Sequence, residues 1–278
     1  MTAQVPALTI VFCTVSCILA FAIPIALMLY LRIKKHADIL PFFIGCAVML
    51  VFALILESIV HNIVLNSASG RKILDNIWLY ALYGGMMAGL FEETGRFIAF
   101  KTVLRKKNSN DANALMYGAG HGGFEAIVLL GFSMISNIAM AVMINSGNIS
   151  AITGVLPEDA LAQVQPVIDQ LVSSSPYLFI AGIIERIFAI ALHIALSVIV
   201  WFAAKNGKKT LLWPSAILIH AAVDGIMVIV SRYSSSVVIT AVSIGAMTLP
   251  AVLAAVSVWR KNSVPSAPEE IQLCPIET

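Results

Sequence analysis

The sequence predicts an all-α membrane protein, a polytopic bundle of transmembrane helices, and three observations support this prediction. Hydrophobic residues make up 59% of the 278 residues, and charged residues make up only 12%. The mean hydropathy of +0.93 is too high for a soluble globular protein. The apolar residues also form segments long enough to cross a hydrocarbon core about 30 Å thick.

Seven segments have this length, so we expect about seven membrane-spanning helices. The first has no basic residue before it and a basic cluster after it, which is the reverse of a cleavable signal peptide. Together the seven predict a single transmembrane domain over residues 1–262, with its core helices at about 76–231. The expected spans lie near residues 7–31, 39–65, 76–104, 113–144, 176–204, 210–231 and 235–259.

Basic residues predict the orientation of the bundle. With the N-terminus outside, twelve lysines and arginines lie at the inner ends of the spans and only three lie in outer loops, as the positive-inside rule requires. The net charge of +2 and these short basic clusters predict no nucleic-acid partner. The inner group is Arg32, Lys34, Lys35, Lys101, Arg105, Lys106, Lys107, Lys205, Lys208, Lys209, Arg260 and Lys261, and the outer group is Arg71, Lys72 and Arg232.

Two segments lie outside the spans. The 145–175 connection contains acidic residues and no Lys or Arg, as expected of an outer loop. Within it, Pro157 followed by the amphipathic stretch 158–172 predicts a short interfacial helix. The Ser/Pro/Glu-rich segment 263–278 has too little apolar content to fold, so we expect a disordered cytoplasmic tail.

The third span contains two adjacent carboxylates and an arginine, Glu92, Glu93 and Arg96. A charged side chain at the centre of a bilayer costs about 2.5 kcal/mol or more, so such groups normally face a polar cavity. Glu92 and Arg96 are four residues apart, which lets the guanidinium hold the Glu92 carboxylate, while Glu93 projects about 100° away. One glutamate is therefore expected to serve structure and the other chemistry, and the sequence leaves open which is which.

Three other spans bring ionisable groups to the same depth. At about 1.5 Å per residue, Glu92, Glu93, His121, Glu125, His193, His220 and Asp224 all lie roughly 12–22 Å above the inner ends of their helices. His121 and Glu125 share one helix face, as do His220 and Asp224, because each pair is four residues apart. The sequence therefore predicts one polar layer built from four helices.

This layer matches what a divalent cation such as zinc requires, namely imidazole and carboxylate ligands. We expect His121, His193, His220 and Asp224 to bind the metal, and Glu92, Glu93, Arg96 and Glu125 to be catalytic residues. A water could be activated by the metal or by a glutamate alone. Glycines at 118, 120, 122 and 123 allow either close helix packing or the approach of a substrate chain beside His121.

A second polar cluster is expected in the outer half of the bundle. Glu57 and His61 share a face of the second span, and Glu185 and Arg186 are adjacent in the fifth. Their depth favours a structural or gating role over a catalytic one.

The order of these motifs resembles the YhfC family of intramembrane proteases. That family looks related to the type II CAAX prenyl endopeptidases, bacteriocin-processing proteins, PrsW proteases and the scaffold subunit of gamma-secretase. By this resemblance Glu92 and Glu93 match paired glutamates that activate water, and His220 with Asp224 matches a terminal His-x-x-x-Asn/Asp motif. The motifs are Glu92-Glu93-x-x-Arg96, Gly120-His121 followed by Glu125, Glu185-Arg186 followed by His193, and His220-x-x-x-Asp224.

The expected function is therefore intramembrane peptide-bond hydrolysis, with zinc as the expected cofactor. The resemblance implies a membrane protein or lipid-modified peptide as substrate, contact with membrane lipid, and a multi-pass location in a bacterial plasma membrane. Two alternatives remain open. A proton-coupled transporter would also use carboxylate and histidine chains, and a non-catalytic scaffold would use the layer only for assembly.

Overall fold

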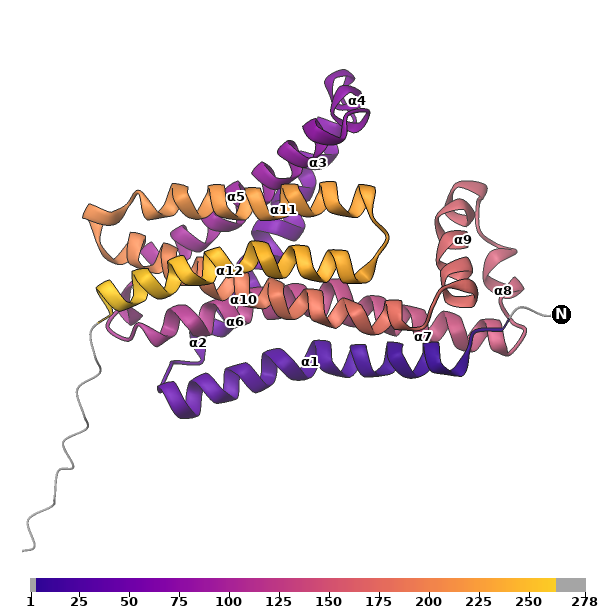
Figure 1. Ribbon diagram of the computed structural model, residues 1–278, viewed down its shortest axis with the longest axis horizontal. Helices are drawn as coiled ribbons and strands as arrows, with labels where there is room; N and C mark the ends of the chain where they lie inside the picture. Colours follow the sequence, from indigo (N-terminus) through magenta and orange to yellow (C-terminus); the bar gives the residue numbers. More distant parts are fainter. Residues whose placement is uncertain (1–3, 264–278) are drawn as a thin grey trace, which may run out of the picture.

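The computed structural model describes residues 4–263, and in this part of the chain every regular element is a helix (Figure 1). Six helical segments are long and apolar enough to cross a membrane. Each lies within four residues of a predicted span. They are α1 (Ala7–Lys35), the rod from Leu40 to Leu65, the rod from Ala112 to Asn145, α10 (Tyr177–Lys205), α11 (Leu212–Tyr233) with the short turn before it, and α12 (Val237–Asn262).

The remaining predicted span is α5 (Ile77–Lys101), which is 25 residues long. It is long enough to cross a membrane but less apolar than the others, because it carries Glu92, Glu93 and Arg96. The exact count of seven spans and the outer location of the N-terminus stay predictions.

Two of the rods contain π-helical segments. The first rod consists of α2 (Leu40–Val48), η1 (Met49–Glu57) and α3 (Ser58–Leu65), and the second of α6 (Ala112–Ala126), η3 (Ile127–Gly131) and α7 (Phe132–Asn145). Glu57 ends η1, and Glu125 lies just before η3. π-helical turns change the direction in which side chains point and frequently occur at functional sites.

Shorter helices lie outside the bundle. α4 (Ala68–Leu74) follows α3, and α8 (Ser150–Thr153) and α9 (Glu158–Ser173) lie at the end of the bundle near the N-terminus (Figure 1). α9 confirms the predicted helix after Pro157, and its interfacial location stays a prediction. The predicted disordered tail falls, apart from Ser263, outside the described residues.

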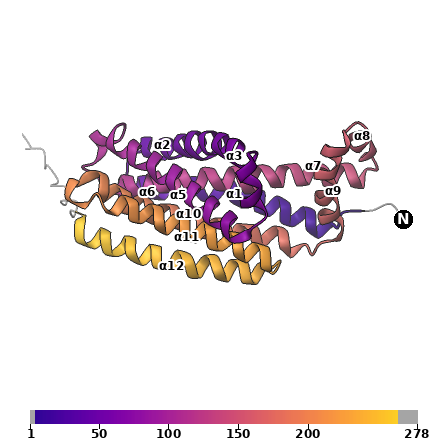
Figure 2. The same cartoon turned by 90° about the horizontal axis from the view of Figure 1, so that it is seen from above.

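α6 lies at the centre of the bundle and is contacted by α1, α2 and α10, while α12 and the α2–α3 rod lie on opposite sides (Figure 2). A Cβ at Gly120 would lie 2.0 Å from the Phe42 carbonyl oxygen of α2, and one at Gly118 would lie 2.5 Å from Ile194 Cα of α10. The glycines beside His121 therefore serve close helix packing. The alternative that they admit a substrate chain is not supported at these two positions, because neighbouring backbone fills the space.

α5 packs against α11 through a second set of small residues. A Cβ at Gly85 would lie 2.3 Å from the Ala221 carbonyl oxygen, and one at Gly89 would lie 2.6 Å from the Ile217 carbonyl oxygen. This close approach brings Glu93 of α5 to His220 of α11. Small residues at a helix interface thus position the polar layer.

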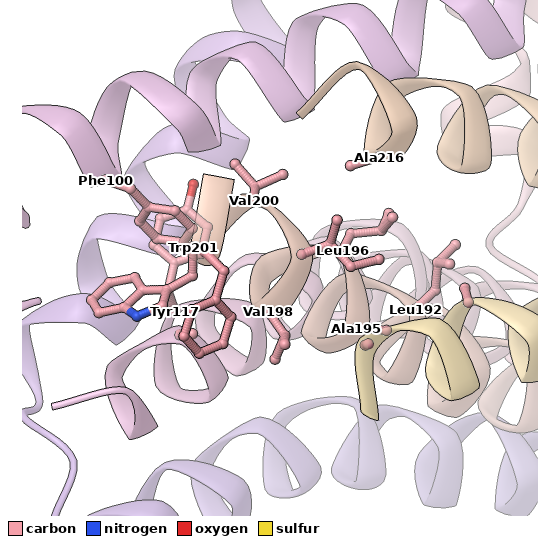
Figure 3. Packing of buried hydrophobic residues seen from close by; sticks show 14 of the residues in the cluster. Phe100, Tyr117, Leu192, Ala195, Leu196, Val198, Val200, Trp201 and Ala216 are labelled. Atoms are coloured by element: carbon pink, nitrogen blue, oxygen red, sulfur yellow. The ribbon is translucent and has the colours of Figure 1, made fainter. Parts of the chain in front are cut away.

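The largest apolar cluster packs beside the polar layer and extends to the basic helix ends. Three of its buried aromatic residues, Phe100, Tyr117 and Trp201, come from α5, α6 and α10 (Figure 3). Phe100 meets Tyr117 and Trp201 edge to face, with ring centroids 4.6 and 5.0 Å apart. The same helices that carry the polar residues are therefore fixed to one another by aromatic packing.

Candidate metal and catalytic site

α5 contributes the paired glutamates and the arginine to the interior of the bundle. Glu92 is 6% exposed, and Glu93 and Arg96 are completely buried. Because these side chains are buried, their charges need neighbouring side chains or a bound ion to neutralise them.

Glu92 faces two histidines from different helices. Its Oε2 atom lies 2.8 Å from Nε2 of His121 on α6 and 3.8 Å from Nδ1 of His193 on α10. The two imidazole rings are 4.8 Å apart between centroids. One ligand atom from each of the three buried residues lies within 4.8 Å of the other two, so Glu92, His121 and His193 could hold a metal ion.

Glu93 has both carboxylate oxygens engaged. Oε2 accepts a hydrogen bond from Nη1 of Arg96, and Oε1 lies 2.8 Å from Nδ1 of His220. The expectation that Arg96 holds Glu92 is therefore wrong: the guanidinium pairs with Glu93, three residues away. The i,i+3 pairing prevails because Glu93 and Arg96 both point toward the α10–α11 side, where His193 and His220 lie.

Arg96 also contacts one of the metal candidates. Its Nη2 atom lies 3.1 Å from Nδ1 of His193. Because a guanidinium can only donate, this ring nitrogen carries the lone pair and His193 has its proton on Nε2. That lone pair is the one that a metal ion would need.

His220 lies between two carboxylates and outside the group of three. Its Nδ1 faces Glu93, and its Nε2 lies 3.4 Å from Oδ2 of Asp224, whose side chain is 39% exposed. The structure thus brings His220 and Asp224 into the layer, beside Glu93. Their assignment as metal ligands stays a prediction.

Glu125 connects the layer to Arg186, which the sequence assigns to the second polar cluster. Glu125 accepts a hydrogen bond from Nε2 of His193 at 2.7 Å and one from Nη1 of Arg186 at 2.6 Å, and Arg186 also pairs with Glu185. Arg186 and Glu185 therefore do not form a separate cluster, because the long arginine side chain reaches the layer from a position two turns away on α10.

Glu57 and His61 contact each other across the helix face that their spacing predicts they share. His61 Nε2 lies 3.0 Å from Oε1 of Glu57, and its Nδ1 lies 3.0 Å from the Tyr83 hydroxyl of α5. Tyr83 was missed because it lies on another helix, and no spacing in the sequence connects it with His61. The role of this pair stays a prediction.

Tyr117 is a second residue that sequence reasoning missed. Its ring stacks on His121 with centroids 5.9 Å apart and lies 5.9 Å from the Arg96 guanidinium carbon. Tyr117 precedes His121 by four residues on α6, so the spacing that identified Glu125 could also have identified it.

Comparison with known proteins fits this geometry. The family model described as YhfC intramembrane metalloprotease matches residues 19–246, which include every residue of the polar layer. The chain belongs to the YhfC family. An uncharacterized membrane protein YhfC of Bacillus subtilis (strain 168) is 39% identical over 214 residues, which cover 76% of this chain and 81% of that protein. No solved structure matches the chain. This YhfC chain is thus a multi-pass membrane protein.

The YhfC family name implies a metal, and the residues present fit one. Two imidazoles and one carboxylate form a common ligand set of zinc hydrolases. Ligand atoms around a tetrahedral zinc ion are about 3.3 Å apart, given bond lengths of about 2.0–2.1 Å. The distances of 2.8 and 3.8 Å from Glu92 to the two histidines bracket this value. Nε2 is the ring nitrogen of His121 that faces Glu92, and Nδ1 makes no hydrogen bond within residues 4–263.

The charges of the YhfC polar layer also favour a cation. Carboxylates outnumber guanidiniums in this layer, so it has an excess of negative charge while the histidines are neutral. A bound cation would reduce this excess, as would a proton on His220, and burying the excess unbalanced would be costly. The charged residues are Glu92, Glu93, Glu125, Glu185, Asp224, Arg96 and Arg186.

Proposed function

We propose that this protein is a metal-dependent intramembrane endopeptidase. The observation that carries the proposal is the buried group of Glu92, His121 and His193, which converges on one point in a layer with excess negative charge. The family description supports the same reaction class. Zinc is the ion that this ligand set favours.

Glu92, His121 and His193 would hold the ion. When bound, it would supply Lewis-acid polarisation of the scissile carbonyl and activation of the attacking water. The remaining steps belong to the side chains around it.

Glu92 would hold the ion through Oε2, and its other oxygen, Oε1, is better placed than Glu93 to accept the proton of the water. Both oxygens of Glu93 are engaged, by Arg96 and His220, whereas Oε1 of Glu92 makes no hydrogen bond within residues 4–263. Glu93 instead holds Arg96 and His220 in place. This assigns chemistry to Glu92 and structure to Glu93.

His220 is placed to return a proton to the leaving amine. Its two ring nitrogens face Glu93 and Asp224, so both can carry protons, and its ring centroid lies 5.3 Å from that of His193. A histidine between two carboxylates is also suited to stabilise an oxyanion. In this proposal His220 acts on the substrate and does not bind the ion.

Glu125 and Arg186 position His193. Glu125 accepts a hydrogen bond from Nε2 of His193, so Nδ1 is the unprotonated nitrogen, 3.8 Å from Oε2 of Glu92. Carboxylates of this kind fix the tautomer and the ring orientation of metal-binding histidines. Arg186 in turn neutralises Glu125.

The proposed substrate is a membrane protein or a lipid-modified peptide, since the layer lies within the length of the spanning helices. The proposed location is the bacterial plasma membrane.

The test is to incubate purified protein with membranes from a strain that lacks its own YhfC protein, and to identify new N-termini by amine labelling and mass spectrometry. New N-termini in membrane proteins should appear with wild type, disappear with Glu92→Gln, and persist with the control Glu158→Gln in α9. A zinc chelator should abolish them and added zinc restore them. The same N-termini from wild type and Glu92→Gln would refute the proposal.

A further inference from the structure

A basic cavity lies at the other end of α5 and α10, away from the polar layer. It has a volume of about 440 Å³ and is lined by Lys101, Arg105 and Asn108, together with Trp201 and Lys205. This volume is within the range of small-ligand sites, about 300–1,000 Å³.

Only part of the positive charge around this cavity is compensated. Lys205 Nζ lies 2.7 Å from Oδ1 of Asp111, which also accepts a hydrogen bond from Trp201 Nε1 at 2.8 Å. Within residues 4–263, no carboxylate lies within 4.0 Å of the Lys101 ammonium or the Arg105 guanidinium. Two exposed cations therefore face the cavity without an anionic partner.

The location of the cavity indicates the source of the anion. Lys101 is the last residue of α5 and Lys205 is the last residue of α10, so the cavity lies where these helices end. Its inner wall contains Phe100 and Trp201, which pack edge to face (Figure 3). A charged rim over an aromatic wall matches a lipid phosphate above its glycerol and acyl groups.

We infer that this cavity binds the phosphate group of an anionic phospholipid of the membrane leaflet at the basic end of the bundle. Lys101 and Arg105 contact the phosphate, Asn108 donates a hydrogen bond to it, and Lys205 completes the rim. Basic pockets between transmembrane helices on the cytoplasmic side are a known form of lipid headgroup site. The inference is independent of the proposed proteolysis.

The competing explanation is that these residues act only as topology signals, as other lysines at this end do. Lys208 and Lys209 provide a matched control, because they lie at the same end of the bundle but do not line the cavity. The double variants Lys101→Gln/Arg105→Gln and Lys208→Gln/Lys209→Gln remove the same charge. Only the first should affect a specific site.

The experiment is native mass spectrometry of the full-length protein from an uncharged detergent, titrated with phosphatidylglycerol, with phosphatidylcholine, or with inorganic phosphate. We expect one phosphatidylglycerol site that prefers this lipid over phosphatidylcholine. Each cation near an anionic headgroup raises the affinity for the lipid about fivefold. The cavity variant, which lacks two cations, should therefore bind phosphatidylglycerol about 25-fold more weakly than wild type, while the control variant should bind it as wild type does. Millimolar phosphate should compete with the lipid.

Three results would overturn the inference. Equal weakening in both double variants would show a diffuse basic surface, and equal binding of the two lipids would exclude an anion site. Binding of inorganic phosphate without phosphatidylglycerol would assign the cavity to a soluble anion instead. Circular dichroism and gel filtration of each variant confirm that it is folded before it is compared.

Discussion

The structure predicts a graded loss of zinc affinity across the polar layer. Replacing His121 by alanine removes one of three protein ligands. Structural zinc sites bind the ion with a free energy of about 10–16 kcal/mol at neutral pH. Divided equally among four ligands, this free energy is about 2.5–4 kcal/mol per ligand. At about 1.4 kcal/mol per factor of ten, His121→Ala should weaken binding by about 10²–10³-fold.

Two further variants set the scale of this series. Glu125→Gln replaces the carboxylate that accepts a hydrogen bond from Nε2 of His193 at 2.7 Å. Losing such a partner typically lowers metal affinity about 10–100-fold. His220→Ala should leave zinc bound, because both nitrogens of His220 face carboxylates outside the group of three. The expected order of affinity is therefore wild type and His220→Ala, then Glu125→Gln, then His121→Ala.

The assay is competition with a fluorescent zinc chelator in detergent, together with zinc content by inductively coupled plasma mass spectrometry. Wild type should carry near-stoichiometric zinc. Folding of each variant is checked by helical circular dichroism. The reasoning is refuted if folded His121→Ala keeps the affinity of wild type, or if His220→Ala loses as much zinc as His121→Ala. The second result would restore His220 as a ligand.

Two further predictions concern stability, and unfolding in detergent checks both. Arg96→Met leaves the buried Glu93 carboxylate without its guanidinium partner and should lower the free energy of unfolding by about 3–5 kcal/mol. Adding Glu93→Gln should recover most of this loss. No recovery in the double variant would contradict the ion pair. Gly120→Ala places a Cβ 2.0 Å from the Phe42 carbonyl oxygen and should cost about 1–3 kcal/mol. The control Gly84→Ala, which has nothing within 4 Å, should be neutral or more stable by up to about 1 kcal/mol.

The depth of the polar layer was predictable because helices have a fixed rise and basic clusters mark one end of each span. The structure confirms that four helices bring their ionisable groups together, from Glu92 on α5 to His220 on α11. What the sequence could not provide was the rotation of each helix about its axis. Rotation decides that Arg96 meets Glu93 and that His121 meets Glu92.

Side-chain length explains the second difference between expectation and structure. The depth calculated from the helical rise per residue places the backbone of Arg186 outside the layer, yet its guanidinium reaches Glu125. Arg186 and His193 are seven residues apart, so they share a face of α10, and Glu125 on α6 lies between them. Helical spacing could have paired Arg186 with His193, but not with a carboxylate of another helix.

The hydrogen bonds of His193 explain how its ring is oriented for binding an ion. Glu125 can only accept a hydrogen bond from Nε2, and Arg96 can only donate a hydrogen bond to Nδ1, so the two neighbours impose the same tautomer. In that tautomer the Nδ1 lone pair accepts the hydrogen bond from Arg96, and Nδ1 lies 3.8 Å from Oε2 of Glu92. An ion bound at Nδ1 would replace the hydrogen bond from Arg96, which would keep its pair with Glu93. Arg96 is in this way part of the site's preorganisation, because it holds the ring of His193 in the tautomer that a ligand needs.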